Sequence, residues 1–423
     1  MRRLICLALE LTCLLGTGIG TAHELNGEMT LRTFGRVSGK DPRLTDAGTR
    51  IQLRYEHHRE DFSVYAEGRF RWNSVFLGDN PYSDEAREAY EASWDLREAY
   101  VQVPTLGFDW SLGWQQVVWG KADQLRILDQ VNPLDLREFV LLDLHDYRRP
   151  IPMVRANRMV GDWETELLWI PTFVKTSFAK PGSEFDIPLL SNPEGVRLLQ
   201  REEYDAIEEG SEVGARIARS FEGLDITLVA FYTRDDEGVF RQSLSQDVDG
   251  PVELQEQHPR YFLGGASFAA PVGNATVLRG EFSYVPARTF MVDDLTGDGL
   301  ERRGEVSAML GLDYTYGDWL LTLQALDRYV IDWRSQFRTA EHTPTFTITV
   351  EGTNFDARLQ TRVFWATMPV TNDGSWLQMK NTYRFDDHWS SALIVDLLFG
   401  PDSGFFGQFD DRDRVGLEVS YRF

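Results

Sequence analysis

The sequence predicts a single transmembrane antiparallel β-barrel of about eighteen strands, with sixteen as the alternative count. Three observations predict it: short segments alternate apolar with polar residues, short and long connections follow one another along the chain, and the last residue is Phe423. After residue 22 no apolar run reaches the roughly 20 residues that a transmembrane helix needs. A soluble multi-strand β protein has a similar composition. The order of residues within each segment therefore decides between a soluble protein and a membrane barrel.

The first residues predict a secretory signal peptide over residues 1–22, which leaves 23–423 as one barrel domain. Arg2 and Arg3 form a basic start, residues 4–19 are mostly apolar, and Gly20 to Ala22 offer small residues at a cleavage site. An uncleaved anchor and a lipoprotein site at Cys13 are the alternatives. A secreted chain without a membrane helix fits a barrel of the outer membrane.

Cysteine usage and charge narrow the classes of chemistry and partner. Both cysteines, Cys6 and Cys13, lie in the signal segment, so the mature chain has no disulfide, thiolate nucleophile or cysteine metal site. Removing Arg2, Arg3 and Glu10 leaves 41 basic and 65 acidic residues. This negative balance argues against nucleic acid as a partner.

The clearest strands alternate over the roughly 9–11 residues that a tilted membrane strand needs. In Arg50–His58, Phe62–Asn73 and Arg414–Phe423, one face is apolar throughout and the other carries charge. A charged side chain on a lipid face costs roughly 2–4 kcal/mol at mid-membrane. Such a separation is therefore expected of a barrel wall, with the charged faces turned to the interior.

Short links recur between these strands, and long polar segments lie between the links. Such an alternation is typical of barrels with short periplasmic turns and long extracellular loops. Trp110, Trp163, Trp319 and Trp389 follow short links and predict a periplasmic aromatic belt. The predicted turns are 59–61, 161–162, 222–223, 272–273, 317–318 and 386–388, and the predicted loops are 120–150, 175–211, 234–259, 286–304 and 401–412.

The polar faces carry nearly balanced charge with many arginines, so the negative excess falls in the loops. A balanced, arginine-rich wall can conduct anions or neutral polar solutes, although cross-strand ion pairing for stability also explains most of these residues. Acidic loops can bind divalent cations shared with lipopolysaccharide, or simply keep the surface solvated. The arginines expected on the lumen wall are Arg54, Arg69, Arg71, Arg279, Arg358, Arg362 and Arg414.

The segment 120–150 is the candidate constriction of the pore. It mixes apolar residues with opposed charges, and Pro133 after Asn132 favours a turn or a helix start. We expect it to fold into the barrel; a cap that packs on itself outside is the alternative. The residues expected to line or brace the constriction are Lys121, Asp123, Arg126, Asp129, Asn132, Asp135 and Arg137.

The runs Gln116–Gly120, Asp129–Asp135 and Phe405–Val415, with the closing Tyr421-Arg422-Phe423, resemble a large proteobacterial outer-membrane barrel family catalogued as a domain of unknown function. They are more distantly similar to alginate-export barrels. The resemblance implies a porin-like fold that works beside a periplasmic lipoprotein and an inner-membrane transporter. The C-terminal strand ending at Phe423 resembles the signal read by the barrel-assembly machinery.

Catalytic and cofactor motifs are absent from the sequence, which predicts a protein that is not an enzyme and needs no cofactor. None of the histidines lies in a catalytic or metal-binding pattern. A weak calcium candidate comprises Asp293, Asp294, Asp298 and Glu301, but its spacing misses the twelve-residue calcium loop. A solvated acidic loop is the preferred interpretation.

The sequence therefore predicts a porin-like channel for diffusion or facilitated transport of small polar or anionic solutes. One alternative is a dedicated conduit for a polysaccharide or a hydrophobic molecule. The others are an outer-membrane hydrolase and a closed barrel that serves as an adhesin or scaffold.

Overall fold

The computed structural model describes residues 22–423 except 79, 143, 188–195, 200–203, 205–206, 245–251 and 294–296. The predicted signal peptide lies outside the described residues, apart from Ala22, where β1 begins. No helix in the described part of the chain is long and apolar enough to span a membrane.

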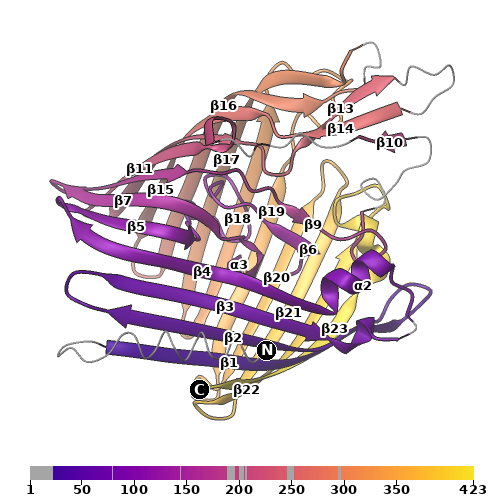
Figure 1. The fold of residues 1–423 in the computed structure, drawn as a ribbon, viewed down its shortest axis with the longest axis horizontal. Helices are drawn as coiled ribbons and strands as arrows, with labels where there is room; N and C mark the ends of the chain where they lie inside the picture. The colour runs from indigo at the N-terminus through magenta and orange to yellow at the C-terminus, as the bar shows by residue number, and fades with distance from the viewer. Residues whose placement is uncertain are drawn as a thin grey trace.

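Within the described residues, eighteen antiparallel strands form one closed sheet, as the sequence predicts (Figure 1). Each strand pairs with its neighbour in the chain, and β23 pairs with β1 to close the barrel. The strands are β1 (Ala22–Arg36), β2 (Arg43–His58), β3 (Ser63–Asn73), β4 (Ala92–Thr105), β5 (Phe108–Gln115), β7 (Ile151–Val160), β8 (Trp163–Ile170), β11 (Glu212–Phe221), β12 (Leu224–Arg234), β15 (Arg260–Val272), β16 (Thr276–Met291), β17 (Leu300–Tyr316), β18 (Trp319–Val330), β19 (Thr345–Asn354), β20 (Leu359–Met368), β21 (Gly374–Arg384), β22 (Trp389–Phe399) and β23 (Arg414–Arg422).

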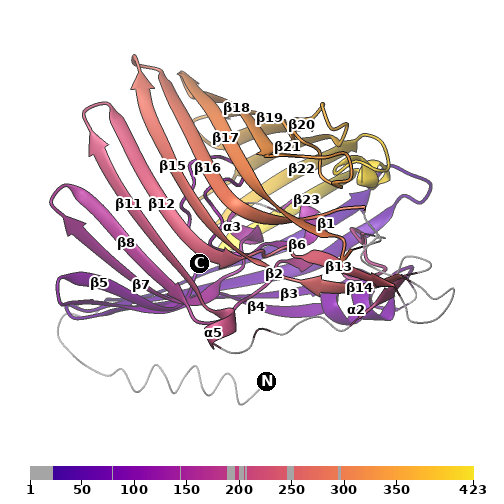
Figure 2. The same cartoon turned by 90° about the horizontal axis from the view of Figure 1, so that it is seen from above.

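The remaining elements all lie in the connections at one end of the barrel. Two of them, β6 and α3, belong to the connection between β5 and β7, and both views of the ribbon place α3 inside the ring of strands (Figures 1 and 2). These elements are η1 (Ser74–Phe76), α2 (Asp84–Tyr90), β6 (Asp135–Val140), α3 (Leu144–Tyr147), β9 (Ser177–Phe178), β10 (Val196–Leu198), α5 (Ile207–Gly210), β13 (Val239–Leu244), β14 (Val252–Gln257) and η2 (Gly407–Arg412).

The closure uses the last residue of the chain. Phe423 donates its backbone N–H to the Gly27 carbonyl at 3.0 Å, and Gly27 donates to the Phe423 carbonyl at 2.9 Å. A Cβ atom on Gly27 would lie 2.3 Å from the Phe423 ring, so only glycine lets the terminal ring lie flat against β1. The aromatic end of the chain is therefore part of the seam.

The strands differ in length around the ring (Figure 2). β5 and β8 have eight residues each, whereas β16 and β17 have 16 and 17. We call β5, β7 and β8 the low wall, and β16 and β17 the tall wall. The connections above the low wall are the long segments 116–150 and 171–211, while residues 292–299 alone join the two strands of the tall wall.

Candidate functional site

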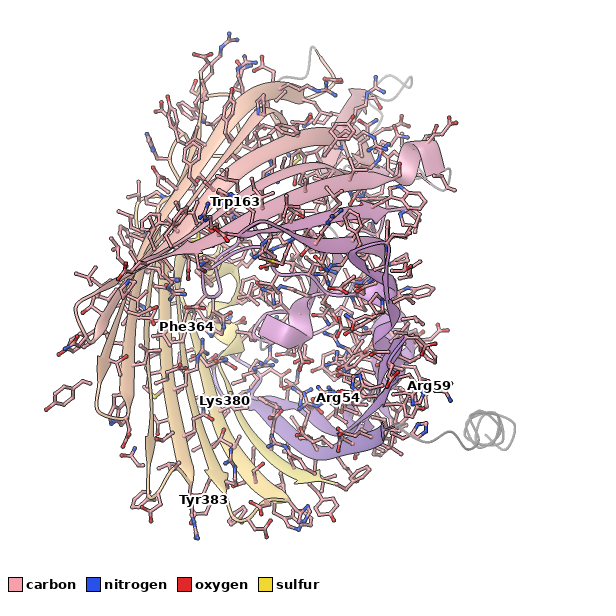
Figure 3. All side chains as sticks on the ribbon, turned by 90° about the vertical axis from the view of Figure 1, so that its left-hand side faces the viewer. Arg54, Arg59, Trp163, Phe364, Lys380 and Tyr383 are labelled. Atoms are coloured by element: carbon pink, nitrogen blue, oxygen red, sulfur yellow. The ribbon has the colours of Figure 1, made fainter. Side chains whose placement is uncertain are left out.

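Wall side chains alternate between a buried inner face and an exposed outer face, as a period of two requires. On β20, Phe364 is 1% exposed and its neighbour Trp365 is 37% exposed. Figure 3 looks into the barrel from the end with the short turns, and Arg54 and Lys380 project into the interior there. The outer face is therefore apolar and the inner face carries charge.

Residues 116–150, which we call the inner loop, pack one apolar side against the interior of the wall. Trp119, Ile127 and Leu128 are almost fully buried in a cluster with wall residues from β7 to β18. The Trp119 ring meets Phe231 edge-on with ring centroids 5.7 Å apart, and its Nε1 donates to Glu166 at 2.9 Å. Burial of a large aromatic side chain contributes on the order of 3 kcal/mol, so this side anchors the loop within the barrel.

A carboxylate of the tall wall holds the start of the inner loop. Glu281 on β16 accepts the backbone N–H of Lys121 and that of Ala122, the latter at 2.8 Å. Hydrogen bonds to an ionised acceptor are roughly twice as strong as neutral ones. Asn132 holds the loop's base, because its side chain accepts from Val117 N–H and donates to the carbonyls of Gln115 and Arg149.

The other side of the inner loop is acidic and pairs with arginines of β1, β3 and β23. Glu138 lies 3.5 Å from Arg32 and 3.3 Å from Arg414, and Asp146 lies 2.8 Å from Arg69. Burial would raise the pKa of Glu138, but the neighbouring guanidinium groups outweigh it and lower that pKa to about 2. The loop is thus held by apolar contacts on one side and ion pairs on the other.

The seven residues predicted for the constriction fall into two groups. Asp129, Asn132 and Asp135 are buried, and Arg126 donates to two carbonyls of its own loop, so these four brace the fold of the loop. The side chains that remain partly exposed are Lys121, which pairs with Asp225 at 3.8 Å, Asp123, which pairs with Arg279 at 2.7 Å, and Arg137, which pairs with Asp135 at 2.5 Å.

Six of the seven predicted wall arginines lie on interior faces of strands, and each has an acidic partner. Arg358 differs: it lies in the turn before β20, which begins at Leu359, because residues 355–357 adopt left-handed backbone conformations there. The closest pairs of the six are Arg54–Glu67 at 3.0 Å, Arg69–Asp146 at 2.8 Å, Arg71–Asp95 at 2.7 Å, Arg279–Asp313 at 2.7 Å, Arg362–Glu351 at 4.0 Å and Arg414–Asp396 at 2.8 Å.

Sequence reasoning did not find the acidic partners on the inner loop. Glu138 and Asp146 follow no alternation that would assign them to a face, and their partners lie far away in the chain. Arg148 was likewise missed; it pairs with the buried Asp129 at 2.6 Å. The presence of many interior arginines was a signal that matching acids exist, but their positions depend on the path of the loop.

The weak calcium candidate does not form a metal cluster among the described residues. Asp294 lies outside them. Asp293 pairs with Arg338 at 2.8 Å and Glu301 with Arg303 at 2.9 Å, while Asp298 lies 4.0 Å from Arg241. These carboxylates face arginines, which satisfies their charge without a cation.

Residues 40–423 match the family described as "Protein of unknown function (DUF1302)". The chain belongs to the DUF1302 family. This agrees with the family resemblance drawn from the sequence but does not extend to the more distant similarity to alginate-export barrels. None of the curated proteins compared with this sequence matches it.

Solved structures of outer-membrane barrels share the fold of this DUF1302 protein. OccAB2 of Acinetobacter baumannii has 8% sequence identity and a TM-score of 0.55, covering 95% of this chain and 98% of its own. OccAB4 of the same organism has 10% identity and a TM-score of 0.53, with the same coverage. The outer membrane channel DcaP, also from A. baumannii, has 13% identity and a TM-score of 0.47, covering 97% of this chain and 99% of its own. The likeness to OccAB2 and OccAB4 shows that the DUF1302 chain has the fold of a porin-like β-barrel.

Proposed function

We propose that this barrel is an outer-membrane diffusion channel for small polar solutes, with a preference for anions, and that the inner loop sets its width. The observation that supports the proposal is a closed barrel of eighteen strands with charged side chains on its inner face and the inner loop packed against that face. Barrels of 16–18 strands leave an aqueous interior unless something fills it. The inner loop packs against one side of the wall and pairs with another.

The preference for anions rests on the interior of β19, β20 and β21. The charged side chains that face inward there are Glu351, Arg362, Lys380 and Arg384, so bases outnumber acids. Arg362 lies 4.0 Å from Glu351, which is a weak pair. The other inward polar groups of β19 are the hydroxyls of Thr345, Thr347, Thr349 and Thr353. Basic side chains along a pore wall favour anions over cations.

Planar bilayer recordings test both parts of this proposal. The purified protein should give discrete conductance steps, and its reversal potential in a salt gradient should have the sign of an anion-selective pore. The double variant Arg362→Gln, Lys380→Gln should move the reversal potential toward zero. Arg59→Gln, in a turn outside the interior, is the matched control and should leave it unchanged (Figure 3). A barrel without conductance would contradict the channel, and cation selectivity would contradict the preference.

A further inference from the structure

The wall of the barrel has an edge without a partner strand beside the low wall. β5 pairs with β4 only from Ala99 to Thr105, so in the described part of the chain no strand pairs with the outer edge of residues 92–98. Figure 1 shows β4 running well past the end of β5. Unpaired strand edges are not tolerated in the hydrocarbon of a membrane unless protein or a cavity covers them.

This open edge lies at the outer border of the hydrocarbon layer. A tilted strand crosses the layer in about 9–11 residues. Counted from the turn after Thr105, that length ends between Arg97 and Asp95. Trp94 comes next and is 80% exposed on the outer face, which is the usual place of a tryptophan at the interface. The open edge is thus within reach of lipid.

A cavity of about 1200 Å³ surrounds this edge. Both faces of β4 line it: Trp94 and Leu96 from the outer face, and Asp95 and Arg97 from the inner face. Trp114, at the end of β5, adds a second exposed ring. The cavity therefore borders the open edge on both faces of the strand.

The segment 173–181 covers the cavity and is attached to the inner loop. β9 pairs in parallel with β6, and the Ser177 N–H donates to the Leu134 carbonyl at 2.8 Å. On its other side the segment contacts α2 and the residue before it: the Lys180 N–H donates to the Tyr90 hydroxyl at 2.9 Å, Ser83 donates to the Pro181 carbonyl, and Lys180 pairs with the exposed Glu85 at 3.1 Å.

Arg149 lines the cavity and forms no short ion pair with a described carboxylate, although Asp135 and Asp95 lie near enough to interact with its charge. Its guanidinium donates to the carbonyl of Lys175. Two other basic residues at the cavity form short ion pairs: Arg137 lies 2.5 Å from Asp135, and Lys175 lies 2.6 Å from Glu256. A cavity lined by exposed rings and by a guanidinium without a short ion pair suits an amphiphile with an anionic head group.

We propose that the open edge of β4 is a lateral portal through which an anionic amphiphile passes between the outer leaflet and the interior of the barrel. The apolar chain lies against Trp94, Leu96 and Trp114, and the anionic head binds Arg149. This proposal rests on the proposed channel, because the portal opens into the same interior. It adds a second route for a second class of solute.

Photo-crosslinking tests the portal. The full-length mature protein is refolded into vesicles that contain a diazirine-bearing hexadecanoic acid, and labelled peptides are identified by mass spectrometry. Labelling should concentrate on residues 92–98 and 173–181, above the level on the outer face of β16 and β17. Arg149→Gln should lower labelling by the acid about tenfold, the loss of one charge-assisted contact, and should leave labelling by the matched alcohol unchanged. Arg158→Gln, near the turns, is the control.

A second variant separates the portal from the channel. Ala179→Trp fills the cavity from its cover and should abolish the local labelling by both probes while the bilayer conductance stays at the wild-type value. Labelling spread evenly over all outer faces, or unchanged in both variants, would overturn the portal whatever the conductance. Local labelling that Arg149→Gln reduces, in a barrel without conductance, would support the portal and overturn the channel.

Discussion

The low wall and the tall wall close the same barrel in different ways. β16 and β17 stay paired over nearly their whole lengths, from Thr276↔Tyr314 to Met291↔Leu300, so backbone hydrogen bonds build that side. β5 and β8 stop after eight residues, and side chains of the inner loop and the segment 173–181 take over. A wall built by backbone hydrogen bonds is rigid. A gap that side chains fill can open, and its side chains can select a solute.

Excision of the inner loop should have the largest effect. Replacing residues 118–148 with Gly-Ser-Gly removes the segment that narrows the interior, so single-channel conductance should rise at least about twofold. The same linker in place of residues 292–299, above the tall wall, should leave conductance unchanged. Equal conductance in the two variants would remove the functional difference between the walls.

We expect ion pairs to contribute more to the free energy of unfolding on the side that the inner loop closes than on the side that paired strands close. Arg69 is 1% exposed and joins β3 to Asp146 of the inner loop. Arg69→Ala removes this charge-assisted hydrogen bond while Arg50 stays 3.2 Å from Asp146, and it should lower the free energy of unfolding by about 1.5–3 kcal/mol. Arg303→Ala on the tall wall, whose partially exposed pair with Glu301 lies within one strand, should cost about 1 kcal/mol or less.

Urea titrations of both variants in detergent micelles measure these differences. The comparison would fail if Arg303→Ala cost as much as Arg69→Ala.

The smallest effect should be that of mild acid. Glu138 holds the inner loop to Arg32 and Arg414, and its pKa is lowered to about 2. A lowered pKa in the folded state means that the stabilisation is complete above the ordinary glutamate pKa of about 4.3 and is lost as the pH falls through 2. Conductance noise should therefore be constant from pH 8 to pH 5 and increase only below about pH 4. Glu138→Gln should show the increased noise at every pH.

Much of the wall could be predicted from the sequence, because the membrane imposes a period of two on every strand. The strand count of eighteen is confirmed, and the turns at 161–162, 222–223 and 317–318 lie where glycine and aspartate indicated them. The sequence did not predict the turns at Leu106-Gly107 and at residues 355–358. Leu106 and Phe355 have φ of 55° and 54°, a conformation that such residues rarely adopt and do not signal.

The candidate site was less predictable than the wall. The amphipathic character of residues 120–150 indicated a loop in contact with the barrel, yet it could not tell a lining residue such as Asp123 from a brace such as Asn132. The end of β5 at Gln115 could not be predicted either. Val117 and Trp119 continue the alternation of the strand, although their side chains already belong to the inner loop. The roles of the loop residues and the end of β5 both depend on contacts between segments that are distant in the chain, and no local sequence pattern encodes such contacts.

The most direct test of the account asks whether the inner loop lines a conducting pore. Residues 23–423 contain no cysteine, so a single thiol can be placed at a chosen position of the barrel. In Asp123→Cys, a cationic thiosulfonate reagent should lower the single-channel current in one step. Leu310→Cys, 61% exposed on the outer face of β17, should be labelled in detergent without any change in current. Complete labelling at position 123 with an unchanged current would contradict the account.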